Sequence, residues 1–327
     1  MKVSIITPVY NGMRYFPETL KSVDRQTYQN FEHIIVDDRS TDGTFESLAD
    51  SNPRRFWFRN DINMGESFSV NRAYELAKGE LVLVLNADDL ISPILLEIAV
   101  QKFREKPSLD VVYPDWDMID EAGIIIQRIH TLNFREQVLF EDFNCIPGPG
   151  AVFRNNLLSP LRDSSFRWAG DYDQWMRLAD VDNFERIPNV LASWRKHPEA
   201  QTHQRGLEMA SERIRLIETA FHRENARSYS RRRALGAAYY FAARLVFFDS
   251  RVPSTVWLLK SYIFRPINWR SVNFRRPITI SFLLAFPFLV PLLKRVFLAN
   301  PKYGKLLSKV LGPEFSRRLS DALGKLE

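Results

Sequence analysis

Two adjacent carboxylates, Asp88 and Asp89, follow an apolar run at residues 81–85 and the amide of Asn86. The unbroken hydrophobicity of residues 81–85 predicts a parallel strand that is buried on both faces. Polar groups just beyond the carboxyl end of such a strand lie where open α/β sheets bind ligands. Carboxylate and amide oxygens suit a small divalent cation that bridges to substrate phosphates. The alternative is the N-cap of the helix that begins near Ser92.

The first hundred residues must position this segment, and they alternate between two patterns. The expected strands are 3–7, 31–36, 56–58 and 81–85, and the expected helices are 16–26, 44–49, 67–77 and 94–103. Alternation of this kind predicts an α/β fold with a doubly wound, mostly parallel sheet. The polar segments 10–12, 38–43 and 86–89 each follow a strand, so they should gather along one edge of the sheet and form a cleft.

Residues 107–205 are less regular. A strand is expected at 111–113, a hairpin turn at 120–123 before residues 124–129, and a loop at 148–150. Residues 171–179 have helical spacing, and residues 190–194 resemble a strand.

The last hundred residues differ in charge from the rest of the chain. Residues 227–327 hold 19 Lys and Arg against 4 Asp and Glu, whereas residues 1–226 hold 26 against 35. We therefore expect a catalytic domain at 1–226 and a basic, aromatic-rich helical region at 227–327. An aromatic-rich helix is expected at 234–248. The uncharged run 277–293 is short for a span and contains two prolines, which favours an element that re-enters or lies on a membrane over a full span or a buried hairpin.

The composition is that of an ordinary folded protein, with 45% apolar and 26% charged residues among 327. Its single cysteine, Cys145, excludes a disulfide framework and a cysteine-based zinc site, and it suits a reducing cytoplasm. Met1 leads straight into a strand, so no signal peptide is expected and the catalytic part should stay in the cytoplasm.

Several motifs occur together in a characteristic order. They are TPVYNG at 7–12, VDDRSTDGT at 36–44, NMGES at 63–67 followed by Asn71, LNADD at 85–89, GDYDQWMRL at 170–178 and WRKHP at 194–198. In this order and spacing they closely resemble the family 2 glycosyltransferases with the GT-A fold. The resemblance covers roughly residues 1–205, and it implies transfer of a sugar from a nucleotide-diphosphate sugar, with UDP as the expected nucleotide.

The resemblance also implies roles on the nucleotide side of the cleft. Asp38 is similar to the family carboxylate that accepts the uracil N3 proton, although an Asp at a strand end is often only a turn former. The other nucleotide-binding candidates are Thr7, Pro8, Tyr10, Asn63, Gly65, Asn86 and Ala87.

A metal site follows from the same resemblance. Asp88 would hold Mn²⁺ or Mg²⁺ on the diphosphate, while Asp89 could ligate or orient. His197 is similar to a family histidine near the diphosphate, with an ordinary surface histidine as the alternative. The family's usual first Asp is Asn86 here, so an amide stands at this position in place of a carboxylate.

Asp171 matches the position of the family's catalytic base, which takes the proton from the acceptor hydroxyl during inversion. Its place at a helix N-terminus would keep the carboxylate ionised, but a simple N-cap is the alternative. Asp173 is a weaker candidate, since it could instead pair with Arg177 at i+4.

The leading hypothesis is an inverting, metal-dependent glycosyltransferase at the cytoplasmic face of the cell membrane. Its expected acceptor is a glycan, lipid-linked, of surface-polysaccharide synthesis, and its expected membrane partner is an anionic surface. Nucleic acid is not expected, because uncharged apolar runs between basic clusters have no use on a phosphate backbone. The alternative is an inactive glycosyltransferase-like binding or scaffold protein, which Asn86 could favour. A nicotinamide enzyme is excluded because no GxGxxG follows the first strand.

Overall fold

The computed structural model describes residues 1–50, 52–141, 147–179, 183–200, 206–222, 230–246 and 251–264. The chain forms two compact units. The first comprises Met1–Gln204 and Thr219–Tyr229, and the second comprises Arg205–Glu218 and Ser230–Glu327.

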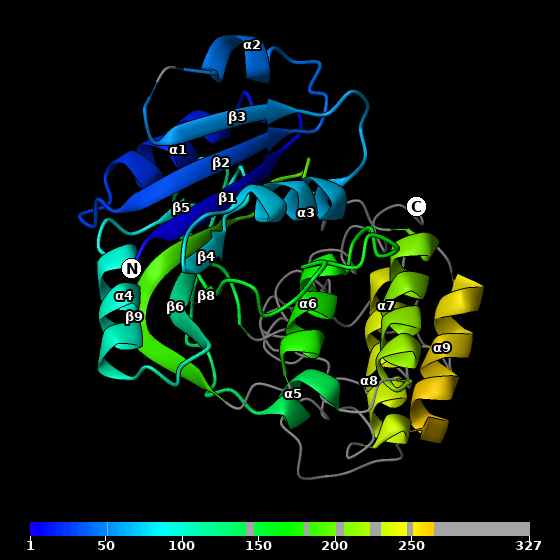
Figure 1. The fold of residues 1–327 in the computed structure, drawn as a ribbon. Helices are drawn as coiled ribbons and strands as arrows, with labels where there is room; N and C mark the ends of the chain where they lie inside the picture. The colour runs from blue at the N-terminus through cyan, green and yellow to red at the C-terminus, as the bar shows by residue number, and fades with distance from the viewer. Residues whose placement is uncertain are drawn as a thin grey trace, which may run out of the picture. The chain divides into compact units, whose positions relative to one another are not determined.

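The first half of the sheet in the first unit is parallel. Its strands are β1 (Val3–Val9), β2 (Phe31–Asp37), β3 (Arg55–Arg59) and β4 (Leu81–Val84), in the order β3-β2-β1-β4 (Figure 1). The connecting helices are α1 (Phe16–Asp24), α2 (Thr44–Leu48) and α3 (Glu66–Leu76), and α4 (Leu95–Glu105) follows the short strand after β4. These elements agree with the α/β alternation predicted from the sequence.

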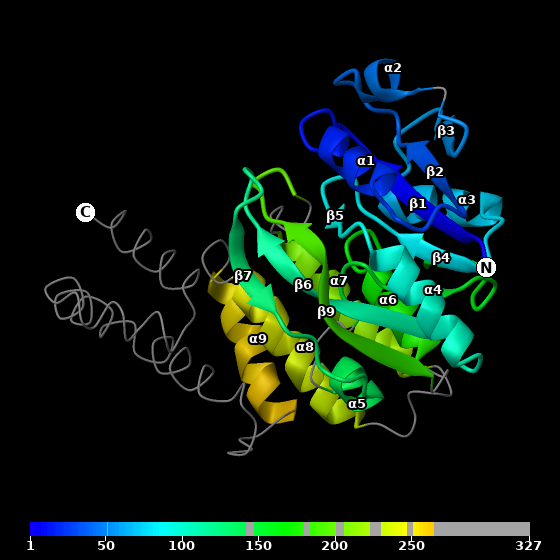
Figure 2. The ribbon, with the colours of Figure 1, turned by 90° about the vertical axis from the view of Figure 1, so that its left-hand side faces the viewer.

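The second half of the sheet is mixed. It adds β5 (Leu90–Ile91), β6 (Val111–Ile119), β7 (Ile125–Ile129), β8 (Val152–Arg154) and β9 (Phe184–Arg195). From β4 the order continues β8-β6-β9-β5, and only the β6–β9 pair is parallel. β7 pairs with β6 across the expected turn, as Figure 2 shows. Two short helices, α5 (Glu136–Phe140) and α6 (Gly170–Leu178), complete the described part of this unit after α4.

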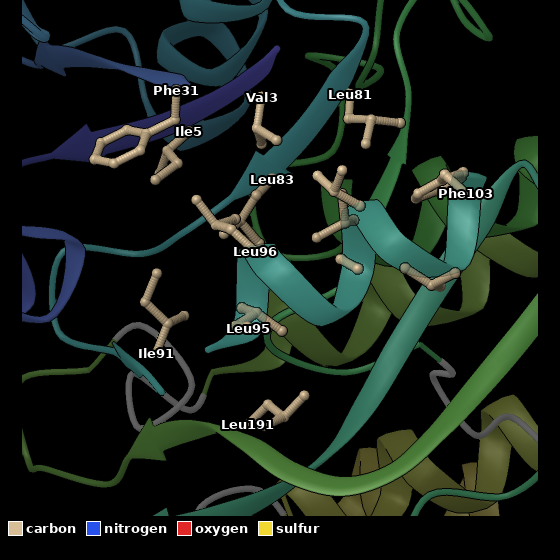
Figure 3. Close-up of a cluster of buried hydrophobic side chains, with 14 of the residues drawn as sticks. Val3, Ile5, Phe31, Leu81, Leu83, Ile91, Leu95, Leu96, Phe103 and Leu191 are labelled. Carbon is tan, nitrogen blue, oxygen red and sulfur yellow. The ribbon is translucent and has the colours of Figure 1, made fainter. Parts of the chain in front are cut away.

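A hydrophobic cluster fixes this sheet against α4. Val3 and Ile5 of β1 pack with Leu83 of β4 and with Leu95 and Leu96 of α4, all nearly inaccessible to solvent (Figure 3). Because successive side chains of a strand alternate between faces, the spacing of Val3 and Ile5 places both on the face that α4 covers. α3 contacts β1 and β2. The apolar runs of the sequence therefore become the buried centre of the parallel half.

A buried carboxylate joins β6 to β9 and to the residues that follow β7. Asp115 of β6 accepts hydrogen bonds from Arg186 of β9 and from Thr131, and its Oδ2 lies 2.9 Å from Nδ1 of His130. Burial by itself would raise the pKa of Asp115, but these partners hold it well below its usual range. The bidentate Arg186 pair thus stabilises the β6–β9 pairing away from the strand edge where the polar loops gather.

His33 of β2 is buried and makes stability depend on pH. Its Nε2 lies 2.9 Å from Oγ1 of Thr7, and burial, with a contribution from Arg55, lowers the pKa of His33 to about 3. In the unfolded chain the imidazole titrates near pH ~6.5. Between these two values the unfolded state binds the proton and the folded state does not, so stability is lost as the pH falls below about 6.5.

We expect the free energy of unfolding of the wild type to decrease more steeply between pH 7 and pH 4 than that of His33→Gln. The difference in slope approaches about 1.4 kcal/mol per pH unit once the unfolded histidine is fully protonated. Urea denaturation at pH 7, 6, 5 and 4 measures it. Parallel pH profiles for the two proteins would contradict the assignment.

The described part of the second unit is helical. It holds α8 (Arg231–Val246), α9 (Arg251–Phe264) and, as far as Glu218, the helix α7 (Leu207–Ala220). The Tyr239 and Phe264 rings stack with centroids 5.6 Å apart, and the Ser261 hydroxyl donates to the Gly236 carbonyl at 2.8 Å. α8 matches the helix expected at 234–248. The expectation for 277–293 lies outside the described residues.

No helix in the described part of the chain combines the length and the hydrophobicity that crossing a membrane requires.

Candidate active site

Three polar loops meet at the carboxyl ends of β1, β2 and β4. After β1, the Asn11 amide donates to Ser40 Oγ and the Gly12 amide donates to Thr44 Oγ1, both at 2.9 Å. In return, the Thr41 amide donates to Oδ1 of Asn11 at 2.8 Å. The prediction that segments 10–12 and 38–43 share one edge of the sheet is therefore confirmed.

The 86–89 loop is tied to the same edge by Thr19 of α1. The Thr19 hydroxyl lies 2.9 Å from each of the carbonyl oxygens of Ala87 and Asp89. The Asp42 carboxylate accepts hydrogen bonds from the amides of Met13 and Thr44. These contacts make one connected rim from loops that are distant in sequence.

Asp38 organises the loop between β3 and α3. Its carboxylate is nearly inaccessible and accepts hydrogen bonds from the Asn60 side chain at 2.7 Å, the Met64 amide at 2.8 Å and the Gly65 amide at 2.7 Å. Gly65 has φ +88° and ψ 164°, a region that is essentially restricted to glycine. Asp38 thus acts first as the anchor of this loop. A carboxylate has about four acceptor positions, so capacity for one further donor remains.

The other nucleotide candidates differ in accessibility. Thr7 and Pro8 are buried, and the Thr7 hydroxyl contacts His33, so Thr7 can shape the rim only through its backbone. Tyr10 and Asn63 are exposed at the rim.

We expect Asp38→Asn to weaken uridine binding by about tenfold. The side-chain nitrogen of the substituted Asn cannot accept the hydrogen bonds that backbone amides now donate to the Asp38 carboxylate. The loop therefore loses charge-assisted hydrogen bonds worth about 1.5–3 kcal/mol each. Calorimetry with uridine measures the effect. As a matched control, Asp37→Asn changes an adjacent carboxylate that is bonded to Ser40 and Arg59. Equal loss of uridine binding in both variants would contradict a specific role for Asp38.

Asp88 and His197 come together from opposite parts of the chain. Nε2 of His197 lies 2.9 Å from Oδ2 of Asp88, although 109 residues separate them. The His197 ring is buried and packs on Tyr15 with centroids 4.5 Å apart, while the Asp88 side chain stays partly exposed. Nδ1 of His197 is buried without a hydrogen-bond partner among the described residues.

Asp89 differs from its neighbour Asp88 in burial and in the partners of its carboxylate. It is buried, its Oδ1 accepts from the Arg195 amide at 3.0 Å, and its Oδ2 accepts from the Asn86 side chain at 3.3 Å. Burial, and then the nearby Asp88 carboxylate, raise the pKa of Asp89 well above its usual value. Of the two roles left open by the sequence, this geometry favours orientation over ligation.

Asp88 and His197 could supply part of the ligand set of a divalent cation. Asp88 and His197 direct one carboxylate oxygen and one imidazole nitrogen at each other, which fits a cation that takes its remaining ligands from a diphosphate and water. Within the described ranges, no group of three or more His, Cys, Asp or Glu side chains could hold a metal ion. A cation bound by Asp88 and His197 would leave its other coordination positions to the substrate and water.

Asp171 lies in the first turn of α6, and α3 fixes the position of that turn. The Ser67 hydroxyl of α3 donates to the Phe166 carbonyl at 3.0 Å, and a Cβ on Gly170 would come within 2.3 Å of Ser67 Oγ. Since Gly65 binds Asp38, the contacts run continuously from the Asp38 loop to the start of α6. The Asp171 carboxylate itself is exposed.

Asp173, the weaker base candidate, is fully buried. Its Oδ2 accepts from Nε of Arg177 at 2.8 Å, which is the i+4 pair expected from the sequence. This ion pair gives the Asp173 carboxylate a structural role within α6.

Sequence reasoning missed Arg195. The WRKH motif directed attention to His197, and nothing in its spacing shows that the arginine two residues earlier is fully buried beside Asp88 and Asp89.

The chain is similar in sequence to known glycosyltransferases. The family described as glycosyl transferase family 2 matches residues 4–161. An uncharacterized glycosyltransferase of Rickettsia typhi is 31% identical over 228 residues, which cover 64% of this chain and 68% of that protein. A chondroitin synthase of Escherichia coli is 29% identical over 191 residues, covering 58% of this chain and 28% of that protein. The chain belongs to glycosyltransferase family 2.

Solved structures share the fold. Residues 1–349 of S. aureus TarS in complex with UDP align with a TM-score of 0.59 at 19% identity, covering 88% of this chain and 86% of that chain. A mannosyltransferase of Pyrobaculum calidifontis, in complex with GDP-Man and Mn²⁺, aligns with a TM-score of 0.53 at 19% identity, covering 90% and 87%. The α/β sheet described above is thus of the GT-A type.

Proposed function

We propose that this glycosyltransferase moves a sugar, with inversion at the anomeric carbon, from a UDP-sugar to a hydroxyl group of a glycan acceptor. The observation that carries the proposal is that the Asp38 loop and the Asp88–His197 pair lie at one edge of the sheet, while α3 connects the Asp38 loop to the first turn of α6. The TarS structures in complex with UDP and with UDP-GlcNAc favour a uridine nucleotide, whereas GDP-Man in the mannosyltransferase is the competing donor type.

In this proposal each group has a distinct task. The Asp38 loop binds the nucleoside, and Asp171 accepts the proton of the acceptor hydroxyl as the oxygen attacks. Asp88 and His197 would hold Mn²⁺ or Mg²⁺, which supplies Lewis-acid stabilisation of the departing diphosphate. Asp89 and Asn86 keep the loop that carries Asp88 in place.

A panel of nucleotide sugars, scored for hydrolysis and transfer with and without Mn²⁺, tests the function. A UDP-sugar should be turned over in the presence of Mn²⁺, and EDTA should abolish turnover. Preference for a GDP-sugar would overturn the donor assignment. Binding of nucleotide without turnover of any sugar would instead favour the inactive scaffold, the alternative that Asn86 raised.

We further propose a lipid-linked acceptor of surface-polysaccharide synthesis and attachment to the cytoplasmic face of the membrane. The support is the excess of basic residues in 227–327. Each basic residue near an anionic surface contributes roughly 1 kcal/mol.

The full chain should therefore co-sediment with vesicles that contain anionic lipid, and less so as salt is raised. Vesicles of neutral lipid are the control. A chain that stays in the supernatant at every composition, or that binds RNA more tightly than vesicles, would contradict membrane attachment.

A further inference from the structure

Arg195, the last residue of β9, connects several segments around the candidate active site. We propose that Arg195 is a positioning residue that fixes the 86–89 loop, and with it Asp88, against α1 and the β6–β7 turn. The inference rests on the proposed function of Asp88, and it assigns a role to a residue whose side chain is fully buried.

The side chain of Arg195 is 0% exposed, and its guanidinium contacts three separate segments. Nη2 donates to Oε2 of Glu18 on α1 at 2.7 Å, and Nε donates to the carbonyl of Asp88 at 3.0 Å. Nη1 donates to the carbonyls of Asp120 and Glu121, in the β6–β7 turn, at 3.3 and 3.1 Å. One rigid group therefore sets the distances between these three segments.

The backbone of Arg195 adds a second connection to the same loop. Its amide donates to Oδ1 of Asp89 at 3.0 Å, so Arg195 binds both adjacent acidic residues, one through its side chain and one through its main chain. His197, two residues further on, meets the Asp88 carboxylate. Tyr15 lies against both side chains. Its ring centre is 5.0 Å from the guanidinium carbon of Arg195 and 4.5 Å from the ring centre of His197.

The geometry requires a guanidinium. Four hydrogen bonds leave its planar fork in fixed directions, whereas a lysine ammonium is a point charge that cannot reach carbonyls on both sides. Arg195→Lys would keep the positive charge beside Asp88 and Asp89 but leave some buried carbonyls without donors. The expected defect is then that the 86–89 loop is no longer held in its orientation, although the positive charge beside it remains.

Arg186 provides a matched control on the same strand. Its guanidinium pairs bidentately with the buried carboxylate of Asp115, and it makes none of the contacts that Arg195 makes with the 86–89 loop. Arg186→Lys should therefore reproduce a general loss of stability without the local effect.

The test compares the full-length wild type, Arg195→Lys and Arg186→Lys by hydrogen exchange and by Mn²⁺ binding in the presence of UDP. In Arg195→Lys, amides of residues 84–91 should exchange at least about tenfold faster, and Mn²⁺ affinity with UDP should fall about 10–100-fold, the usual effect of removing a group that orients a ligand. Affinity for uridine alone should stay within about twofold. Arg186→Lys should match the wild type in the exchange of residues 84–91, in Mn²⁺ affinity with UDP and in uridine affinity.

Wild-type protection of residues 84–91 in Arg195→Lys, or equal loosening in Arg186→Lys, would overturn the positioning role. If Arg195→Lys does not fold, Glu18→Gln removes only the half-exposed partner and should still accelerate exchange in 84–91. A wild type that binds neither UDP nor Mn²⁺ would contradict the proposed function, and the exchange comparison would then decide the positioning role by itself.

Discussion

Asp171→Asn is expected to lower kcat for transfer by ~10²–10⁴-fold while the Kd for the donor stays nearly unchanged. The amide has the size of the carboxylate but cannot take the acceptor's proton. Because Asp171 is exposed in the first turn of α6 and its carboxylate bonds only the amide of Tyr172 among the described residues, the substitution should leave the fold intact. Steady-state transfer and calorimetry with the nucleotide separate the two effects.

Asp173→Asn is the matched control, since it changes a carboxylate two residues away. Asp173 is buried and paired with Arg177, so its variant should lose stability, seen as a lower Tm, more than it loses chemistry. Transfer at the wild-type rate in Asp171→Asn would exclude it as the base. Loss of kcat at unchanged Tm in Asp173→Asn would move the role there.

The second large effect is expected for Asp88→Ala. Metal-dependent binding of UDP should weaken by about 10–100-fold, because the cation loses its charged protein ligand and His197 loses the partner that orients it. Titration of UDP in the presence of Mn²⁺ and in EDTA measures the metal-dependent part.

Binding of uridine, which has no diphosphate, provides the control for Asp88→Ala. It should be unchanged, whereas Asp38→Asn should weaken it. If both variants lost uridine and UDP binding equally, the division of the cleft into a nucleoside side and a metal side would be wrong.

The sequence by itself determined the parallel half of the fold and the edge at which the site forms. Runs such as 81–85 are apolar throughout, and a strand covered on both faces requires that pattern. Polar turn residues directly after β1, β2 and β4 then had to meet, because parallel strands end at the same edge. Three of the motifs that resemble the family, at 7–12, 36–44 and 85–89, reach into those turns.

The sequence predicts strands near 111–113 and 190–194, but only the tertiary structure decided how the second half of the sheet is completed and paired. β5 and β8 contain two and three residues, too few for a periodic signal, and they are strands because longer neighbours supply their hydrogen bonds. β9 runs from Phe184 to Arg195, but polar residues and Pro188 interrupt its pattern. Its pairing with β6 places Arg195 and then His197 beside the 86–89 loop.

The tertiary structure also separated residues that the sequence treats alike. Asp88 and Asp89 are identical neighbours, yet the first is partly exposed toward His197 and the second is buried between Arg195 and Asn86. Successive residues of a tight loop point in different directions, and partners more than a hundred positions away determine which carboxylate stays available. The local sequence pattern does not indicate such long-range contacts. The role of Arg195 could therefore be inferred only from the tertiary structure, in which β9 lies beside the 86–89 loop.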